Sequence, residues 1–212
     1  YDNWKLRRYF AKLRPGQHVP YAAATNLAVR REIALKVGGF REDLVDADDS
    51  EFTYRLSKAG YKVIYEPSMV IYHQKAEEAH LKTLIRATML VSFGYGQVAA
   101  IHGLKWHPVC LVYASVIPFG ISMLLLAMLN PVLALLLVIL SLITILGYFI
   151  YQALISRAWV ALLGILVEPI RLMLAGISFQ LGYIYQKALY RFPRITFVIR
   201  KVFDYIRLKV GH

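Results

Sequence analysis

The sequence predicts a short α/β segment followed by an α-helical membrane region. Of its 212 residues, 58% are hydrophobic, which is more than soluble globular domains usually contain. The charged residues are also placed unevenly, since no Lys, Arg, Asp, Glu or His occurs between Pro108 and Ser156. A polar, soluble amino-terminal part and a membrane-embedded remainder would explain both observations.

The amino-terminal part begins with helical patterns. Residues 1–14 are basic and aromatic and predict a short helix facing solvent or the membrane surface. A second helix is predicted over residues 31–37, where Gly38 and Gly39 close it. A third helix begins after Asp48 or Asp49, either of which can cap it. Glu51, three residues after Asp48, completes the pattern of a capping box.

Two short strands are predicted next, at residues 62–65 and 69–73, with Pro67 between them. The second run is apolar and suits a buried strand. Residues 77–104 then predict a long amphipathic helix, which Gly94 and Gly96 weaken locally. Because this helix directly precedes the first apolar span, we expect it to lie along the membrane surface.

The uncharged run is too long for a single membrane crossing. As a helix it would measure about 70 Å, against a hydrocarbon core of about 30 Å. We therefore predict two helices, at residues 108–129 and 131–153, with a turn at Asn130-Pro131. A third apolar segment, residues 158–186, contains Glu168 and Arg171, which lie three apart and can neutralise each other. These patterns divide the chain into a soluble part with the surface helix (1–106), a membrane region (107–192) and a basic amphipathic tail (193–212).

The side of the membrane on which the tail lies is left open by the sequence. Three crossings would put it opposite the soluble part, yet clusters of Lys and Arg near a membrane segment favour the cytoplasmic side. The third segment could instead turn back at Pro169, where a helix hydrogen bond is lost. We expect three membrane-embedded helices, with the tail on a headgroup surface.

The formal net charge of +12 is best explained by anionic lipid, not nucleic acid, because most basic residues flank the apolar spans. The single cysteine, Cys110, falls inside the first span and can form no internal disulfide.

An ordered set of motifs occupies residues 20–75. It comprises an asparagine, two arginines, a Gly-Gly-Phe turn, an acidic pair before a Glu-apolar-x-x-Arg-Leu helix, a Gly-Tyr pair and a strand ending in histidine. These are Asn26, Arg30-Arg31, Gly38-Gly39-Phe40, Asp48-Asp49, Glu51-Phe52, Arg55-Leu56, Gly60-Tyr61 and His73. In order and spacing, the set resembles the C-terminal half of the catalytic domain of family-2 glycosyltransferases.

The resemblance implies that residues 1–106 are the C-terminal portion of a Rossmann-like nucleotide-sugar domain on the cytoplasmic side of the membrane. It also implies an inverting enzyme that moves a sugar from a nucleotide-sugar donor to a lipid-linked or polysaccharide acceptor. Inversion is a direct displacement by an acceptor hydroxyl, and one carboxylate that takes its proton is enough.

The resemblance assigns roles to five residues. Asp49 is the general base, and Asp48 takes the place that Glu usually holds in the family. Asn26 lines the donor or acceptor site. Arg55 orients the carboxylates or the substrate, or is a surface residue of its helix. His73 is a ligand of a divalent metal ion, Mn²⁺ or Mg²⁺, or a structural residue at the end of its strand.

Two departures from the family pattern limit the prediction. The N-terminal half with its Asp-x-Asp metal motif does not occur in these residues, so we expect the same protein or a partner chain to supply it. The Gln-x-x-Arg-Trp motif of processive synthases is also missing, which favours transfer of a single sugar. The alternative is a non-catalytic membrane subunit that docks a partner. A channel is disfavoured because the spans have few polar residues to line a path.

Overall fold

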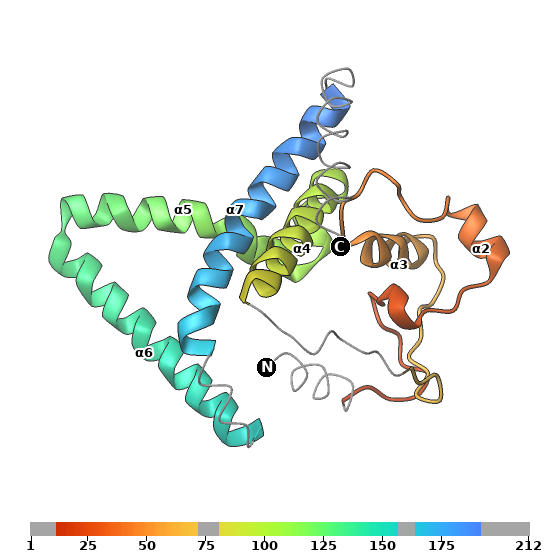
Figure 1. The fold of residues 1–212 in the computed structure, drawn as a ribbon, viewed down its shortest axis with the longest axis horizontal. Helices are drawn as coiled ribbons and strands as arrows, with labels where there is room; N and C mark the ends of the chain where they lie inside the picture. Colours follow the sequence, from red (N-terminus) through yellow and green to blue (C-terminus); the bar gives the residue numbers. More distant parts are fainter. Residues whose placement is uncertain (1–11, 72–80, 157–163, 192–212) are drawn as a thin grey trace.

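The computed structural model describes residues 12–71, 81–156 and 164–191, of which 72% are helical. Three short helices lie in the amino-terminal part: η1 (Ala24–Asn26), α2 (Arg31–Lys36) and α3 (Asp48–Lys58). The later elements are α4 (Leu81–His102), η2 (Leu104–Trp106), α5 (Pro108–Leu129), α6 (Pro131–Ser156) and α7 (Gly164–Arg191). Figure 1 shows α4 and α7 side by side, with the short helices on one side of them and the α5–α6 hairpin on the other.

The prediction of an α/β, Rossmann-like half-domain is wrong, because the described residues contain no strand or sheet. Residues 62–65, predicted as a strand, make only an isolated antiparallel bridge between His18 and Ile64. Residues 69–71 of the second predicted strand have no regular structure, and its end at His73 lies outside the described residues. A pair this short has no further strands beside it, and β-propensity alone does not stabilise such a ladder.

Helix α3 anchors the amino-terminal part. Its Phe52 and Leu56 are buried against Val19 and Val63, which brings the two bridged segments onto the helix. The predicted capping box is not formed. The residue that precedes α3 is Ala47, in the left-handed conformation with φ +61°, and no side chain caps the helix.

Helices α4 and α7 pack with their backbones in close contact. A Cβ atom added to Gly96 of α4 would lie 2.1 Å from the carbonyl oxygen of Phe179. A Cβ atom on Gly182 of α7 would lie 2.1 Å from that of Phe93. Gly96, predicted to weaken this helix locally, is where a second helix approaches. Small residues permit such approach. The position of α4 along the membrane surface stays a prediction.

The contacts between α4 and α7 advance in the same direction along both helices. Ser178 Oγ donates to the carbonyl of Met89 at 2.7 Å, and Gln97 Nε2 donates to Gln186 Oε1 at 2.9 Å. The two helices therefore run parallel. Helix α5 crosses α7 near Gly176, where a Cβ atom would meet the side chain of Val116.

Among the described residues, three helices are long and apolar enough to span a membrane: Thr83–His102, Pro108–Leu129 and Pro131–Tyr151. They agree with the predicted membrane association and with the two predicted helices on either side of Asn130. The remaining one lies in α4, which was predicted along the membrane surface. The predicted third segment, residues 158–186, begins outside the described residues, and its crossing stays a prediction. Of the most apolar window in α4, 44% is buried within the protein, compared with 6% and 11% for the windows in α5 and α6. Of these three helices, α5 and α6 therefore leave the larger share of their apolar surface uncovered by protein, where lipid would cover it.

Two local predictions in the membrane region are confirmed. Asn130 ends α5, and its Oδ1 accepts the backbone N–H of Leu133 at 3.0 Å, so the turn also caps α6. Glu168 and Arg171 form the expected ion pair, with Nη1 and Oε1 3.3 Å apart.

Candidate functional site

The acidic residues at the start of α3 form the first part of the candidate site. Asp49 is partly exposed; its Oδ2 accepts a hydrogen bond from Ala24 N at 3.0 Å, and its Oδ1 accepts one from Ser50 N at 2.6 Å. Each carboxylate oxygen keeps a further lone pair. Asp48 is the first residue of α3 and is exposed. Backbone contacts therefore fix Asp49 in orientation while its exposure leaves room for a substrate.

Asn26 belongs to the same region because η1 contacts Asp49 through Ala24. The Asn26 side chain is exposed, and its Nδ2 donates to the carbonyl of Met69 at 2.7 Å. This bond ties η1 to the segment after the His18–Ile64 bridge. Asn26 thus lies close to Asp49, but its amide already has a structural partner.

A groove of about 760 Å³ runs beside η1. It is lined mainly by apolar side chains, including Val19, Leu27, Val63 and Ile64, together with Asn26. Ile64 is 55% exposed although it is fully apolar. The groove is large enough for a ligand or for a segment of another chain.

An aromatic cluster lies between α3 and the start of α5. The Tyr21 ring is 4.6 Å from His107 and 5.7 Å from Trp106, measured between centroids, and Tyr54 is 6.0 Å from Trp106. Tyr95 of α4 closes the cluster at 5.2 Å from Trp106. Trp106 is only 2% exposed, so the cluster is a packed link between the amino-terminal part and the membrane helices.

Burial changes the protonation of two members of this cluster. It raises the pKa of Tyr21, with a further contribution from Tyr54, and it lowers the pKa of His107. The neutral imidazole suits its position, since His107 Nδ1 accepts the backbone N–H of Val109 at 3.2 Å and caps α5. Asp49 lies on the same helix as Tyr54, which belongs to this cluster.

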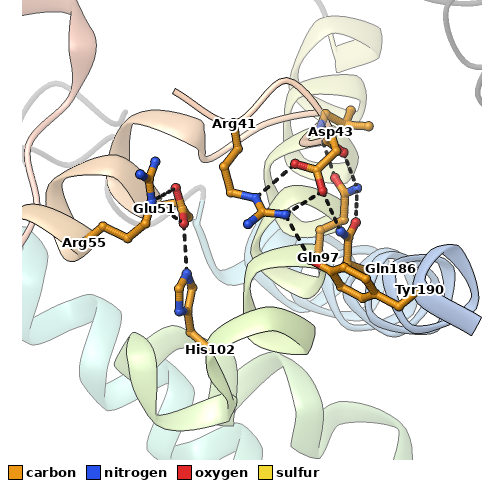
Figure 2. Close-up of polar contacts among 9 residues, drawn as sticks. Arg41, Asp43, Glu51, Arg55, Gln97, His102, Gln186 and Tyr190 are labelled. Atoms are coloured by element: carbon orange, nitrogen blue, oxygen red, sulfur yellow. Dashed lines mark hydrogen bonds and ion pairs between the residues drawn. The ribbon is translucent and has the colours of Figure 1, made fainter. Parts of the chain in front are cut away.

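The side chain of Arg55 contacts Glu51 and not Asp49. Figure 2 shows it beside Glu51, whose carboxylate accepts both from Arg55 Nε, at 2.8 and 2.9 Å, and from His102 Nε2, at 2.9 Å. The guanidinium also donates to the carbonyls of Val37 and Gly39. Since Arg55 lies six residues after Asp49, the two side chains point about 120° apart around α3. The structure therefore places Arg55 in a link between α2, α3 and α4.

A second polar cluster connects the loop before α3 to the long helices (Figure 2). Arg41 is paired with Asp43 at 2.8 Å, and Gln186 Nε2 of α7 donates to Asp43 Oδ2 at 2.9 Å. Gln97 of α4 donates to the backbone carbonyl of Asp43 at 3.1 Å. Burial alone would raise the pKa of Asp43, but the hydrogen bonds from Arg41 and Gln186 outweigh it and the pKa is lowered.

The described residues do not by themselves form the expected Mn²⁺ or Mg²⁺ centre. No three His, Cys, Asp or Glu side chains come close enough to hold a metal ion in residues 12–71, 81–156 and 164–191. His73, the proposed ligand, lies outside those residues. We therefore assign no step of a reaction to a metal ion.

Sequence reasoning missed the roles of Glu51, His102 and Gln97. Glu51 reads as a capping residue because of its spacing from Asp48, and its contact with His102 spans 51 positions in the chain. A signal for Gln97 was present, since an uncharged polar residue among apolar and small neighbours needs a partner when buried. The sequence cannot say which partner that is.

A scan against models of known protein families finds no match to this chain, and searches of the curated proteins and of the solved structures find none either.

Proposed function

We propose that this chain is the membrane-bound part of a glycosyltransferase that moves one sugar from a nucleotide-sugar donor to a lipid-linked or polysaccharide acceptor, with inversion. The observation that supports it is the position of Asp49. This carboxylate is partly exposed and held by backbone N–H groups, and its helix α3 contacts Trp106, just before α5, through Tyr54. A base at that place can meet an acceptor anchored in the bilayer, on the cytoplasmic face in this proposal.

In the proposed reaction Asp49 takes the proton of the acceptor hydroxyl. The acceptor oxygen then forms a bond to the anomeric carbon on the face opposite the leaving group, while the bond to the nucleoside diphosphate breaks with its electron pair. Asp49 ends protonated and later releases the proton to water. In this proposal Asn26 contacts the sugar through its amide oxygen, because its Nδ2 already donates to the carbonyl of Met69. Residues of another segment or a partner chain hold the donor.

The test is Asp49→Asn in the complete protein, assayed in membranes with radiolabelled nucleotide sugars. General-base catalysis usually contributes at least about a hundredfold, so we expect a loss of that size in transfer while donor binding persists. Glu32→Gln, an exposed carboxylate of α2, is the control and should retain activity. Transfer by Asp49→Asn at the control's rate would remove Asp49 from the mechanism.

A non-catalytic membrane subunit is the second candidate, and the apolar groove favours it. Ile64, Met69, Val70 and Ile71 are all exposed along or next to this groove, as expected of a surface that a partner chain covers. A photo-crosslinking residue at Ile64 separates the candidates when combined with the transfer assay. Crosslinks to another protein without any sugar transfer by the complex would support the subunit.

A further inference from the structure

A basic pocket lies where the carboxyl-terminal ends of α2 and α3 meet the end of α4. It has a volume of about 480 Å³ and is lined by Lys36, Val37, Tyr54, Arg55, Lys58, Ala59 and His102. Two lysines, an arginine and a histidine contribute to this lining, and no acidic side chain does. The pocket is therefore a candidate for binding an anion.

Two of the positive charges have no counter-ion among the residues that the structure describes. Arg55 is neutralised by the buried carboxylate of Glu51. Lys36 and Lys58 are exposed, and neither forms an ion pair with any residue in the described part of the chain. Lys58 Nζ lies only against the Tyr54 ring, 5.4 Å from its centroid. Both ammonium groups thus remain available to a ligand.

The surroundings of the pocket place it near a membrane surface. His102 ends α4, and α5, one of the helices able to span a membrane, begins six positions later at Pro108. Leu35 is 60% exposed and Phe40 46% exposed, on either side of Lys36 in the chain. Exposed apolar residues next to lysines are typical of surfaces that enter the boundary between headgroups and acyl chains.

We propose that this pocket binds the phosphate of an anionic lipid headgroup, with Lys36 and Lys58 as the groups that contact it. Basic pockets beside membrane helices recognise such headgroups, and an ammonium is a strong point charge for phosphate. The pocket is distinct from the site around Asp49, because Lys58 lies nine residues after Asp49, about 13 Å along α3. Its occupation does not depend on whether the chain transfers sugar.

The test measures binding of short-chain lipids to the full chain in dodecyl maltoside by titration calorimetry. The probes are dihexanoyl phosphatidic acid, dihexanoyl phosphatidylcholine and inorganic phosphate. We expect saturable binding of phosphatidic acid that K36Q/K58Q weakens at least about tenfold, since each lysine near a surface adds to headgroup affinity. K36R/K58R keeps both charges and should stay within about threefold of wild type. The matched control is K12Q/K105Q, which removes two exposed lysines outside the pocket.

The remaining outcomes would contradict either the role of the two lysines or the identification of the ligand as a lipid headgroup. Equal weakening by K12Q/K105Q and K36Q/K58Q would show non-specific attraction, and an unchanged affinity of K36Q/K58Q would show that the lysines only complement the dipoles of α2 and α3. Phosphatidylcholine bound as tightly as phosphatidic acid would exclude selection for a net negative headgroup. Inorganic phosphate bound as tightly as phosphatidic acid would make free phosphate the ligand.

Discussion

Glu51 illustrates how a single residue joins the amino-terminal part to α4. Its side chain is 0% exposed and holds its charge only because Arg55 and His102 contact it. Burial alone would raise the pKa of Glu51, but the hydrogen bonds from His102 and Arg55 outweigh burial, so the pKa lies below its ordinary value of 4.5. Removing one partner of a buried pair leaves the other charge uncompensated, which is far more costly than losing a surface pair.

Glu51→Gln should therefore destabilise the protein by about 3 kcal/mol at pH 7. Because the pKa is lowered by folding, the stabilisation by Glu51 is complete above pH 4.5 and is lost as the pH falls through the folded-state pKa. The difference in stability between wild type and Glu51→Gln should accordingly shrink below pH 4.5. Tryptophan fluorescence during unfolding in detergent measures it, with Trp106 next to the cluster as the reporter.

The control for this prediction is Glu66→Gln, because Glu66 is exposed and its carboxylate is hydrogen-bonded only to Ser68 in the described structure. It should change stability by less than about 0.5 kcal/mol. Equal effects of the two substitutions at pH 7 would show that the Glu51 cluster adds no stability.

Ala47 has the only positive φ, +61°, among the described residues other than glycine, and it directly precedes Asp48 and Asp49. An alanine in this conformation costs about 1–2 kcal/mol, which Ala47→Gly would relieve. Two effects of the substitution destabilise the variant. It removes a buried methyl group worth about 0.8 kcal/mol, and it raises the conformational entropy of the unfolded chain, which costs about 0.4–1 kcal/mol.

These effects nearly cancel, so Ala47→Gly should keep the stability within about 1 kcal/mol of wild type. Ala47→Val should lose at least about 2 kcal/mol, because a branched side chain tolerates a positive φ worse and the site is buried. Chemical unfolding of the two variants provides the measurement. Stability that is equal in both variants would mean that the backbone there relaxes freely.

At the scale of elements, the packing of α4 against α7 depends both on glycines, which allow the backbones to approach, and on a hydrogen bond between two glutamines. Gly96 and Gly182 let each helix touch the other's backbone, and this approach brings the buried amides of Gln97 and Gln186 within 2.9 Å. Close backbone packing and internal hydrogen bonds are the terms that stabilise helix pairs in apolar surroundings.

Gly96→Ala should therefore destabilise the protein by about 1–3 kcal/mol, since its Cβ atom would collide with the carbonyl of Phe179. The loss should appear even though alanine in a helix is favoured over glycine by about 1 kcal/mol. Gly120→Ala in α5 is the matched control, because no atom lies within 4 Å of its added Cβ. Thermal unfolding in detergent should show Gly120→Ala unchanged or stabilised. A stabilised Gly96→Ala would contradict the observed packing.

At the scale of the whole molecule, the contacts of α7 show where its carboxyl-terminal end lies relative to the amino-terminal part. Tyr190 Oη accepts a hydrogen bond from Arg41 at 2.9 Å, and Gln186 contacts Asp43. The end of α7 therefore lies on the same side as the amino-terminal part. This position argues against a third crossing that would carry the end of α7 away from the amino-terminal part.

Cysteine labelling in sealed vesicles checks this arrangement, with Cys110 replaced by alanine as the background. Single cysteines at Lys62 and Lys187 should react with an impermeant maleimide from the same side. A cysteine at Asn130, between α5 and α6, should react from the opposite side, because α5 is about 33 Å long and matches the hydrocarbon core. Labelling at Lys187 from the side of Asn130 would contradict the contact between α7 and the amino-terminal part.

Local patterns were sufficient to predict the two apolar helices, the turn at Asn130 and the Glu168–Arg171 pair. Each depends on residues close together in the chain: hydropathy over one helix length, a proline that ends a helix, and charges three residues apart. The acidic start of α3 was likewise predicted from local spacing, whereas the chemistry assigned to Asp49 stays a prediction.

Tertiary contacts decided the rest. Residues 62–65 lack neighbouring strands, so a sequence suited to a strand forms only a bridge. Gly96 lowers the stability of an isolated helix, but in the folded protein it allows α7 to pack against α4. Glu51 has the spacing of a capping-box residue, but its side chain contacts His102. In each case the residue's local preference is worth about 1 kcal/mol or less, while the contact with a distant segment is worth more. Local preferences can be read along the chain, whereas the identity of a distant partner is settled only when the helices pack.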